Sequence, residues 1–286
     1  MTARIALLGT GRMGSAIARR LASAGYELTV WDRTRAHAEA LGTGQVVETP
    51  AAAARAAEIV ISSLTGPEAV RAVYEGPAGA LQAVAGQSFI DMSTVGPDVI
   101  AELEPALAAR GSRLLAVPIM GAPPVVAAGR ATLLAGGDAL AFERARPVLE
   151  QLGTVRRVGS IGDAQRLKLI ANSLLGIAAS GAAELQAAGE AAGLEPGDVF
   201  WVLSRLVPGL EVRRDGYIGG PDQPTLFAMR DLQKDLHLAA ESLQRKVGVP
   251  SLVATTRALV DEATSRMPYE DISALVRLYR PAAGQD

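Results

Sequence analysis

A lysine and an asparagine four residues apart, in the segment QRLKLIANS (165–173), are the first candidates for chemistry in this sequence. The chain has only three lysines, Lys168, Lys234 and Lys246, against 25 arginines, and Asn172 is its sole asparagine. Residues four apart on a helix share a face, so Lys168 and Asn172 would project together. An ammonium group can stabilise the negative charge that hydride transfer leaves on a carbonyl oxygen and deliver the proton, which an arginine does poorly at neutral pH. The alternative is a surface lysine beside an incidental asparagine.

A glycine-rich stretch near the N-terminus, LLGTGRMGS (7–15), is the second candidate. Gly9, Gly11 and Gly14 form G-x-G-x-x-G between an expected strand and an expected helix, whose Ile17 and Leu21 would face inward. The first glycine permits a tight turn, the second lets the backbone approach a pyrophosphate, and the third lets helix and strand pack closely. The position before a second strand predicts a dinucleotide-binding loop; the alternative is a plain strand–helix turn.

The residues after the second expected strand bear on the choice of nicotinamide cofactor. Asp32 could accept hydrogen bonds from the ribose hydroxyls of NAD, whereas Arg33 and Thr34 could hold the 2'-phosphate of NADP. We favour NADP, on the interpretation that a mobile Asp32 can turn to solvent while Arg33 and Thr34 have few other reasons to be paired there. NAD is the alternative cofactor.

The elements that must position these residues follow from the hydrophobic pattern. In the first half, short β-branched runs alternate with alanine-rich helical stretches, which predicts a doubly wound parallel sheet. Strands are expected at 4–9, 27–32, 58–64, 88–93, 113–119 and 131–137, and helices near 12–24, 34–41, 67–75, 97–109 and 138–151. Thr49 and Pro50 predict the start of a further helix, and Gly111 the end of one.

The second half lacks strand patterns. From Gly162 to about Ala191 there is no proline, which predicts one helix of about 30 residues and roughly 45 Å. Further helices are expected after it, with breaks at Gly193–Pro196, Pro208–Gly209, Gly219–Pro224 and Gly248–Pro250. We therefore predict a Rossmann-type α/β domain over residues 1–160 and an all-α domain over residues 161–286 that includes the long interdomain helix.

Composition argues against several classes of protein. Apolar residues make up 49% of the 286 residues, and the net charge of −2 gives no reason to expect nucleic acid or an acidic membrane surface as partner. The absence of cysteine excludes disulfides and thiolate sites, and the two histidines, His37 and His237, lack the spacing of a metal site. No uninterrupted apolar run reaches membrane-span length and no signal-peptide pattern is present, so we expect a cytoplasmic protein.

Taken together, the motifs resemble the 3-hydroxyacid dehydrogenase family, which includes 3-hydroxyisobutyrate dehydrogenase and tartronate semialdehyde reductase, over nearly the whole chain. The loop Gly-x-Gly-x-Met-Gly and the triplet Asp32-Arg33-Thr34 are similar to the cofactor motifs of that family, whose NADP-using members have Asn-Arg-Thr. SSLTGPEAV (62–70) and DMSTVGP (91–97) resemble its cofactor-contact segments. The resemblance implies further cofactor contacts at Arg12, Met13, Leu64 and Thr65, and at Thr94 near the nicotinamide ribose.

The same resemblance implies roles in the second half. GDAQRLKLIAN is similar to the family's Gly-x-Gly-x-x-x-Lys-x-x-Asn-Asn, which implies that Lys168 is catalytic and that Asn172 contacts substrate. FAMRDLQKDLHLA resembles its late Lys-Asp motif, which implies Lys234 at the cofactor and Phe227 and Asp235 at the substrate. EDISALVRLY (270–279) matches its C-terminal signature. The family also implies a homodimer or higher oligomer, for which the small residues on one face of the long helix are a candidate interface, unless they pack within the chain: Ser173, Gly176, Ala179, Ser180, Ala183 and Ala187.

Three positions depart from the family pattern. In VPIMGAPPVV the substrate-binding segment is Met120, Gly121 and Ala122, and Met120 stands where the family has serine. A thioether cannot donate a hydrogen bond to a carboxylate. Ala122 replaces a glycine and Ala171 the first asparagine of the usual pair.

The sequence predicts an NADP-preferring oxidoreductase that interconverts a small 3-hydroxy acid and its semialdehyde or keto form. The first alternative is an imine reductase on the same architecture, which Met120 and Ala122 favour and Lys168 opposes. The second is a catalytically silent NADP-binding scaffold, against which Lys168, Asn172 and Thr94 speak.

Overall fold

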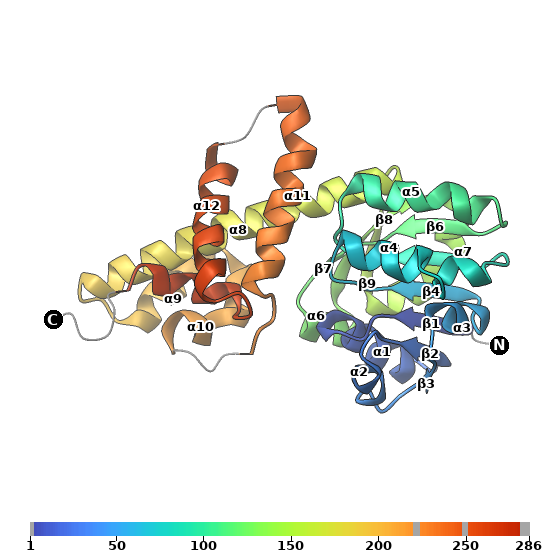
Figure 1. Cartoon of the computed structure of the whole chain (residues 1–286). Helices are drawn as coiled ribbons and strands as arrows, with labels where there is room; N and C mark the ends of the chain where they lie inside the picture. The colour runs from blue at the N-terminus through green and yellow to red at the C-terminus, as the bar shows by residue number, and fades with distance from the viewer. Residues whose placement is uncertain (1–2, 220–223, 248–250, 281–286) are drawn as a thin grey trace. The chain divides into compact units, whose positions relative to one another are not determined.

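The computed structural model of the chain describes residues 3–219, 224–247 and 251–280, with the side chains of 244–247 and 251 left out. The chain divides into two compact units, Met1–Leu169 (unit 1) and Ile170–Asp286 (unit 2), whose elements are labelled in Figure 1. The domain boundary that the sequence suggests, between residues 160 and 161, stays a prediction.

Unit 1 is built on a sheet of nine strands within the described residues, in the order β3-β2-β1-β4-β5-β6-β8-β7, with β9 paired to β8. The six strands from β3 to β6 are parallel, and their order is that of the Rossmann nucleotide-binding fold. The strands are β1 (Ile5–Leu8), β2 (Leu28–Trp31), β3 (Gln45–Val46), β4 (Ile59–Ser62), β5 (Ser88–Asp91), β6 (Arg113–Ala116), β7 (Ile119–Met120), β8 (Ala131–Gly137) and β9 (Gly153–Arg157).

All six expected strands are present, and the sheet departs from the expected parallel arrangement only at one end. β8 runs antiparallel to β6 and β7, and only β9 continues beside it in parallel. No sequence pattern indicated β9, because GTVRR is largely exposed and carries no buried apolar side chain, or β3, which has only two residues. Both strands lie at the margins of the sheet, where burial imposes little pattern.

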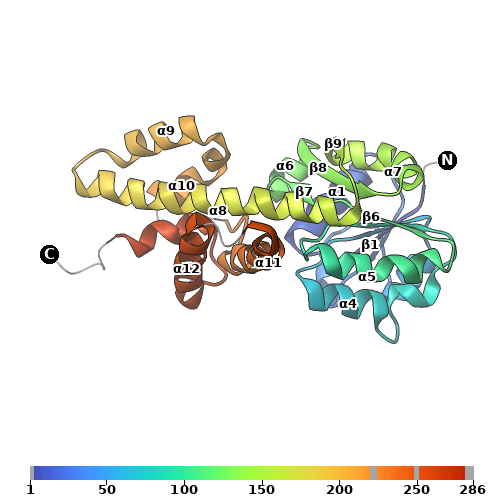
Figure 2. The same ribbon diagram turned by 90° about the horizontal axis from the view of Figure 1, so that it is seen from above.

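Helices cover both faces of the sheet. They are α1 (Arg12–Ser23), α2 (Arg35–Glu39), α3 (Pro50–Arg55), α4 (Pro67–Glu75), α5 (Pro97–Ala108), α6 (Pro123–Ala127) and α7 (Ala139–Leu152), with a short 3₁₀ helix η1 (Ala80–Ala83). Helices α1 and α7 lie on one face of the sheet and α4 and α5 on the other (Figure 2). Side chains alternate along β1, so that Ile5 and Leu7 pack with α1 and α7, whereas Ala6 and Leu8 pack with α4 and α5. The predicted N-cap is confirmed, since the Thr49 side chain accepts a hydrogen bond from the Ala52 N–H at 3.0 Å.

The long helix is confirmed as α8 (Ile161–Ala191), 31 residues without a break. Its first turns belong to unit 1, where Ile161, Ala164 and Gln165 are buried. Gly136 on β8 allows this approach, because a Cβ at that position would lie 2.2 Å from the Ser160 carbonyl oxygen and 2.9 Å from the Ala164 Cβ. The start of α8 is therefore packed directly on the sheet.

Unit 2 is helical in its described residues apart from one isolated bridge between Ala228 and Asp271. Besides most of α8 it contains α9 (Pro196–Leu206), η2 (Pro208–Arg213), α10 (Arg214–Ile218), α11 (Met229–Val247), α12 (Ser251–Arg266) and η3 (Ile272–Leu278). The expected breaks at 193–196 and 208–209 are confirmed. The break at 248–250, and 220–223 of the break at 219–224, lie outside the described residues.

The small-residue face of α8 packs inside unit 2. Ala179, Ala183 and Ala187 are buried in its core. A Cβ at Gly176 would lie 3.3 Å from Leu232 on α11 and 3.4 Å from Thr256 on α12. Intramolecular packing, the alternative reading of this face, is the one the structure supports.

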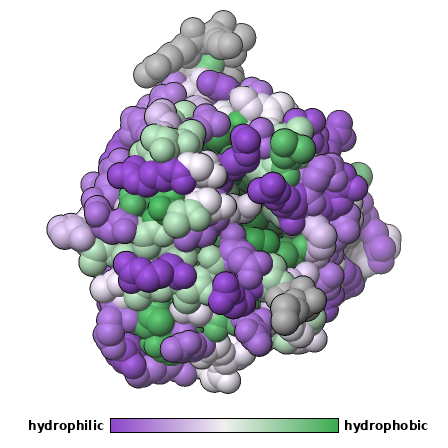
Figure 3. Space-filling model, turned by 90° about the vertical axis from the view of Figure 1, so that its right-hand side faces the viewer, coloured by the Kyte–Doolittle hydropathy of each residue, from purple (hydrophilic) through white to green (hydrophobic). Residues whose placement is uncertain are grey.

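The surface offers no single dominant apolar area on the face drawn in Figure 3, where hydrophilic side chains alternate with small hydrophobic areas. Among the described residues, no helix has both the length and the apolar character needed to cross a membrane. The described residues also contain no group of three or more His, Cys, Asp or Glu side chains that could hold a metal ion.

Candidate cofactor and catalytic site

The glycine loop between β1 and α1 has the geometry that its pattern predicts. Gly9 has φ +95°, and a Cβ there would lie 2.4 Å from the Ser63 carbonyl oxygen. A Cβ at Gly14 would lie only 2.0 Å from the Gly9 carbonyl oxygen, so α1 and the loop touch at this point. Nothing lies within 4 Å of a Cβ built on Gly11. Open space at the second glycine, directly before the helix, fits the approach of a pyrophosphate.

Asp32 is not mobile, which corrects the interpretation drawn from the sequence. Its Oδ2 accepts hydrogen bonds from the Thr10 backbone N–H at 2.7 Å and the Thr10 hydroxyl at 3.0 Å, and its Oδ1 accepts one from the Thr34 N–H at 2.8 Å. The side chain is 13% exposed. Asp32 therefore ties the glycine loop to the segment after β2, while the Arg33 and Thr34 side chains remain exposed beside it.

Leu64, Thr65 and Thr94 follow β4 and β5 at the carboxyl edge of the parallel sheet, the edge that also carries Gly9 and Asp32. The Leu64 N–H donates to the Ser93 hydroxyl at 2.9 Å, so the two loops are joined to each other. Ligands of open α/β sheets bind at this edge. In unit 1 the structure thus brings together, at one edge of the sheet, the expected cofactor residues from four separate loops, those after β1, β2, β4 and β5.

A buried polar network supports these loops from below. Ser62 donates to the Asp91 carboxylate at 2.5 Å, and the Ser93 N–H and hydroxyl donate to it at 3.0 Å and 3.1 Å. The Tyr74 hydroxyl lies 2.8 Å from the Ser62 hydroxyl. Burial disfavours the charged form and raises the pKa of Asp91 to about 6, against the opposing effect of its hydrogen bonds to Ser62 and Ser93. Burial likewise raises the pKa of Tyr74.

Lys168 lies on the face of α8 that is directed into unit 1. The buried residues Ile161, Ala164 and Gln165 mark that face, and Lys168 follows them at the next position of the same stripe. Lys168 itself is partly exposed, whereas its neighbours Leu167 and Ile170 point outward, 40% and 49% exposed. Lys168 therefore lies on the sheet-facing stripe of α8, and its catalytic role stays a prediction.

In unit 2, three of the expected site residues meet. The Asn172 amide donates to the Asp235 carboxylate at 2.5 Å, and the Lys234 ammonium lies 2.5 Å from its other oxygen. Asp235 is 2% exposed. Because both oxygens of Asp235 are engaged inside the chain, its visible role is to hold Asn172 and Lys234 in place.

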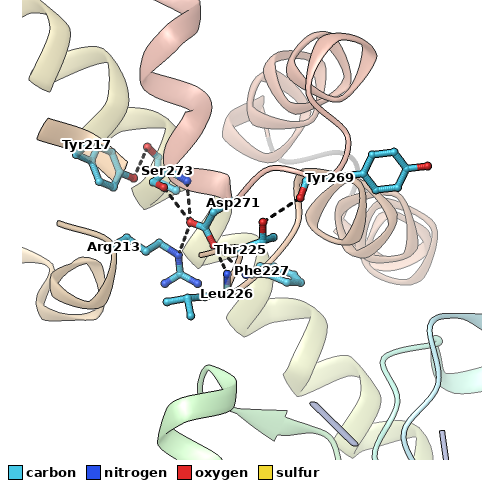
Figure 4. A network of polar contacts seen from close by, with 9 residues as sticks. Arg213, Tyr217, Thr225, Leu226, Phe227, Tyr269, Asp271 and Ser273 are labelled. Atoms are coloured by element: carbon cyan, nitrogen blue, oxygen red, sulfur yellow. Dashed lines mark hydrogen bonds and ion pairs between the residues drawn. The ribbon is translucent and has the colours of Figure 1, made fainter. Parts of the chain in front are cut away.

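Phe227 is held by a second buried carboxylate. Asp271 accepts hydrogen bonds from the Leu226 and Phe227 N–H groups at 2.8 Å and 2.9 Å and from the Arg213 side chain at 3.1 Å (Figure 4). The side chains of Arg213 and Asp271 are only 6% and 4% exposed. The segment that presents Phe227 is therefore anchored by an ion pair inside unit 2.

The Met120–Ala122 segment joins β7 to α6. Met120 is 39% exposed, Gly121 has φ +146°, and Ala122 is the residue before the first turn of α6. An exposed thioether at this position gives the segment an apolar surface in place of a hydroxyl. Met120, which stands where the family has serine, therefore lies at an exposed position of unit 1.

Among the residues that were not singled out from the sequence are the buried Asp91, Gln165 and Asp271. Gln165 could have been found, since it lies three residues before Lys168 on a predicted helix and so shares its face. Asp91 occurs in the quoted motif DMSTVGP, but no pattern announces that it is buried. The partners of Asp271 are up to 58 residues away in the sequence.

Two family models match consecutive parts of the chain. The model of the NAD binding domain of 6-phosphogluconate dehydrogenase matches residues 4–162, and that of NAD-binding of NADP-dependent 3-hydroxyisobutyrate dehydrogenase matches residues 162–279. A 3-hydroxyisobutyrate dehydrogenase of Pseudomonas aeruginosa is 33% identical over 96% of this chain and 98% of its own length.

Solved structures agree with these matches. A 3-hydroxyisobutyrate dehydrogenase of Mycobacterium tuberculosis, solved with L-serine, has a TM-score of 0.83 at 25% identity and covers 98% of this chain and 100% of its own. Psf3 in complex with NADP+ and 2-OPP has a TM-score of 0.87 at 26% identity and covers 96% and 99%. Fold and site define an NAD(P)-binding oxidoreductase. The chain belongs to the 3-hydroxyacid dehydrogenase family.

Proposed function

We propose that the protein is an NADP-preferring oxidoreductase that interconverts a small 3-hydroxy acid and its semialdehyde or keto form, with Lys168 as general acid and base. The observation that carries the proposal is the position of Lys168 on the sheet-facing stripe of α8, one turn beyond the buried Ile161, Ala164 and Gln165. Lys168 is one of only three lysines in the sequence, which has 25 arginines.

Bound NADPH would supply the hydride. The glycine loop and the first turn of α1 would hold its pyrophosphate, and Thr94 and Leu64 would lie along its nicotinamide end. In reduction, the Lys168 ammonium would donate a proton to the carbonyl oxygen; in oxidation, the neutral amine would accept that proton from the hydroxyl. Asn172, oriented by Asp235, anchors the substrate.

The preference for NADP rests on Arg33 and Thr34. Because the Asp32 carboxylate already accepts three hydrogen bonds from Thr10 and Thr34, it has little capacity left for ribose hydroxyls. The exposed Arg33 guanidinium can pair with a 2'-phosphate. A higher kcat/KM for NADH than for NADPH contradicts this preference.

The substrate class is supported by the relatives, named as 3-hydroxyisobutyrate dehydrogenases and, in one case, solved with L-serine. The exposed Met120 favours a second candidate, imine reduction, because a thioether offers no hydrogen bond to a carboxylate. A panel of 3-hydroxyisobutyrate, L-serine, small semialdehydes and one cyclic imine separates the two candidates.

Lys168→Ala tests the chemistry. We expect NADPH binding to be unchanged and turnover to fall by about 10²- to 10⁴-fold, because proton transfer to the oxygen is lost. Lys168→Arg is the matched control: it keeps the charge but transfers a proton poorly, so it should remain slow. Full activity of Lys168→Ala contradicts the assignment. Tight NADPH binding by the unaltered protein with no turnover on the whole panel indicates a catalytically silent scaffold.

A homodimer is also proposed, on surfaces other than the small-residue face of α8. Large apolar side chains are exposed on α9 and the segment before it, including Leu194, Trp201 and Leu206, which are 59%, 57% and 80% exposed. Their burial against a second copy would remove them from water. Sedimentation that shows only monomer at micromolar concentration contradicts the proposal.

A further inference from the structure

Gln165 has an unusual position in unit 1. Its side chain is fully buried, and both ends of its amide bond to the backbone of one turn. Its Nε2 donates to the Ser93 carbonyl oxygen at 3.0 Å, and its Oε1 accepts from the Val95 N–H at 3.3 Å. The two backbone groups flank Thr94, so the amide clamps this residue from both sides.

The turn that Gln165 clamps is itself fixed to the sheet. The Ser93 N–H and hydroxyl donate to Asp91 at the end of β5, and the Ser93 hydroxyl accepts from the Leu64 N–H. The turn therefore has a defined position relative to β4 and β5. Through Gln165, the same position is imposed on the start of α8.

Helix geometry carries this constraint to Lys168. Residues three apart on a helix are neighbours on one face, with about 5–6 Å between their Cβ atoms. A shift of the helix by one residue moves it by about 1.5 Å along its axis and turns its side chains by about 100°. Such a shift would break both hydrogen bonds of Gln165. The amide therefore fixes both the depth and the rotation of the turn that carries Lys168.

We propose that Gln165 is a positioning residue for the reaction, which sets the Lys168 ammonium at its distance from the nicotinamide end of the cofactor by locking α8 to the turn around Thr94. The proposal rests on the proposed function, since it requires Lys168 to transfer the proton. A purely structural role is the alternative, because a buried glutamine that bonds to backbone stabilises any fold.

Gln186 provides the matched control. It is also a fully buried glutamine on α8, and its Nε2 donates to the Pro196 carbonyl oxygen at 3.0 Å and to Glu190 at 2.9 Å. It lies in unit 2 and in none of the networks at the proposed site. Gln165→Met and Gln186→Met therefore make the same chemical change at two buried positions of one helix.

The experiment compares kcat, the KM for NADPH, and the number of NADPH sites per chain in both variants. For Gln165→Met we expect kcat to fall by about 10²-fold, the loss that a misplacement of about 1 Å can cause. The KM for NADPH should change less than about threefold, and the number of NADPH sites should stay at that of the unaltered protein. Deuterium at the transferred position of NADPH should slow Gln165→Met at least as much as the unaltered protein, since hydride transfer is the step that is impaired.

The inference is overturned if kcat of Gln165→Met lies within about threefold of that of Gln186→Met. It is also overturned if the loss of activity equals the loss of NADPH sites, because that result means a smaller folded fraction. Lys168→Ala is measured alongside. A slow Lys168→Ala with a fast Gln165→Met refutes this inference alone, whereas a fast Lys168→Ala refutes the proposed function.

Discussion

Replacing Asp91 by asparagine should change how the stability of unit 1 depends on pH. Asp91 is completely buried, and its burial raises the pKa from an ordinary 3.8 to about 6. The amide of asparagine can still donate to Ser62 and accept from the Ser93 N–H, but it has no charge to bury. The substitution therefore removes one titrating group and adds a constant offset from altered hydrogen bonding.

The sign follows from proton uptake. Between pH 3.8 and about 6 the native chain holds a proton on Asp91 that the unfolded chain has released. Stability therefore falls as the pH rises through this window and stays lower above it. The total loss is about 3 kcal/mol for a pKa difference of about two, and about 2 kcal/mol of it falls between about pH 4.5 and about pH 7.5.

The free energy of unfolding is measured by urea titration at both pH values in a Trp201→Phe background. The chain has two tryptophans, so Trp31 on β2 then reports unit 1 alone. Other groups titrate equally in the parent and in Asp91→Asn, so their contributions cancel in the difference between the two proteins. We expect the parent to lose about 2 kcal/mol more than the variant from low to high pH.

A difference between the two proteins that is the same at both pH values, within about 0.5 kcal/mol, refutes the reasoning. It would mean that Asp91 ionises with the same ease in the folded and the unfolded chain, and hence that its burial is offset by Ser62 and Ser93. A difference of the opposite sign would mean that the network stabilises the charged form.

Three further substitutions test the residues that support the site. Gly14→Ala should destabilise unit 1 by about 1–3 kcal/mol, because its Cβ would meet the Gly9 carbonyl oxygen. Gly11→Ala should leave the melting temperature unchanged but weaken NADPH binding, since its Cβ enters the open space where the pyrophosphate is expected. Calorimetry and NADPH titration of both variants check this, and equal stability of the two variants contradicts it. Asp271→Ala should destabilise unit 2 by about 3–5 kcal/mol, because Arg213 would be left buried without its partner; urea unfolding measures it, and a loss below about 1 kcal/mol contradicts it.

The fold was predictable from the sequence where an element is buried and therefore needs a recognisable run of apolar residues. The buried parallel strands were found as short β-branched runs between alanine-rich stretches, and the unbroken 31-residue α8 as a long stretch without proline. The direction of β8 was not predictable, since a continuous apolar run such as ATLLAGG reads the same in either direction. β9 was not predicted because an exposed strand at the margin of a sheet needs no apolar side chains.

At the site, the sequence located the loops but not what holds them. The glycine spacing predicted the geometry at Gly9, Gly11 and Gly14, because each position requires glycine for its own steric reason and the sequence motif records all three. The expectation that Asp32 turns to solvent failed because its Oδ2 accepts hydrogen bonds from Thr10, which lies 22 residues earlier and which no local pattern reveals. Hydrogen bonds between distant segments leave no periodic trace, so only the folded chain shows them.

The same use of an aspartate carboxylate recurs in four of the hydrogen-bond networks. Asp32, Asp91, Asp235 and Asp271 each use both carboxylate oxygens to hold a segment that carries a proposed site residue. A carboxylate accepts several hydrogen bonds at once, so one short side chain can tie together donors from two or three segments. In this chain the four aspartates fix segments that carry residues of the proposed site, in which the proposed function assigns contact with the substrate to Lys168 and Asn172.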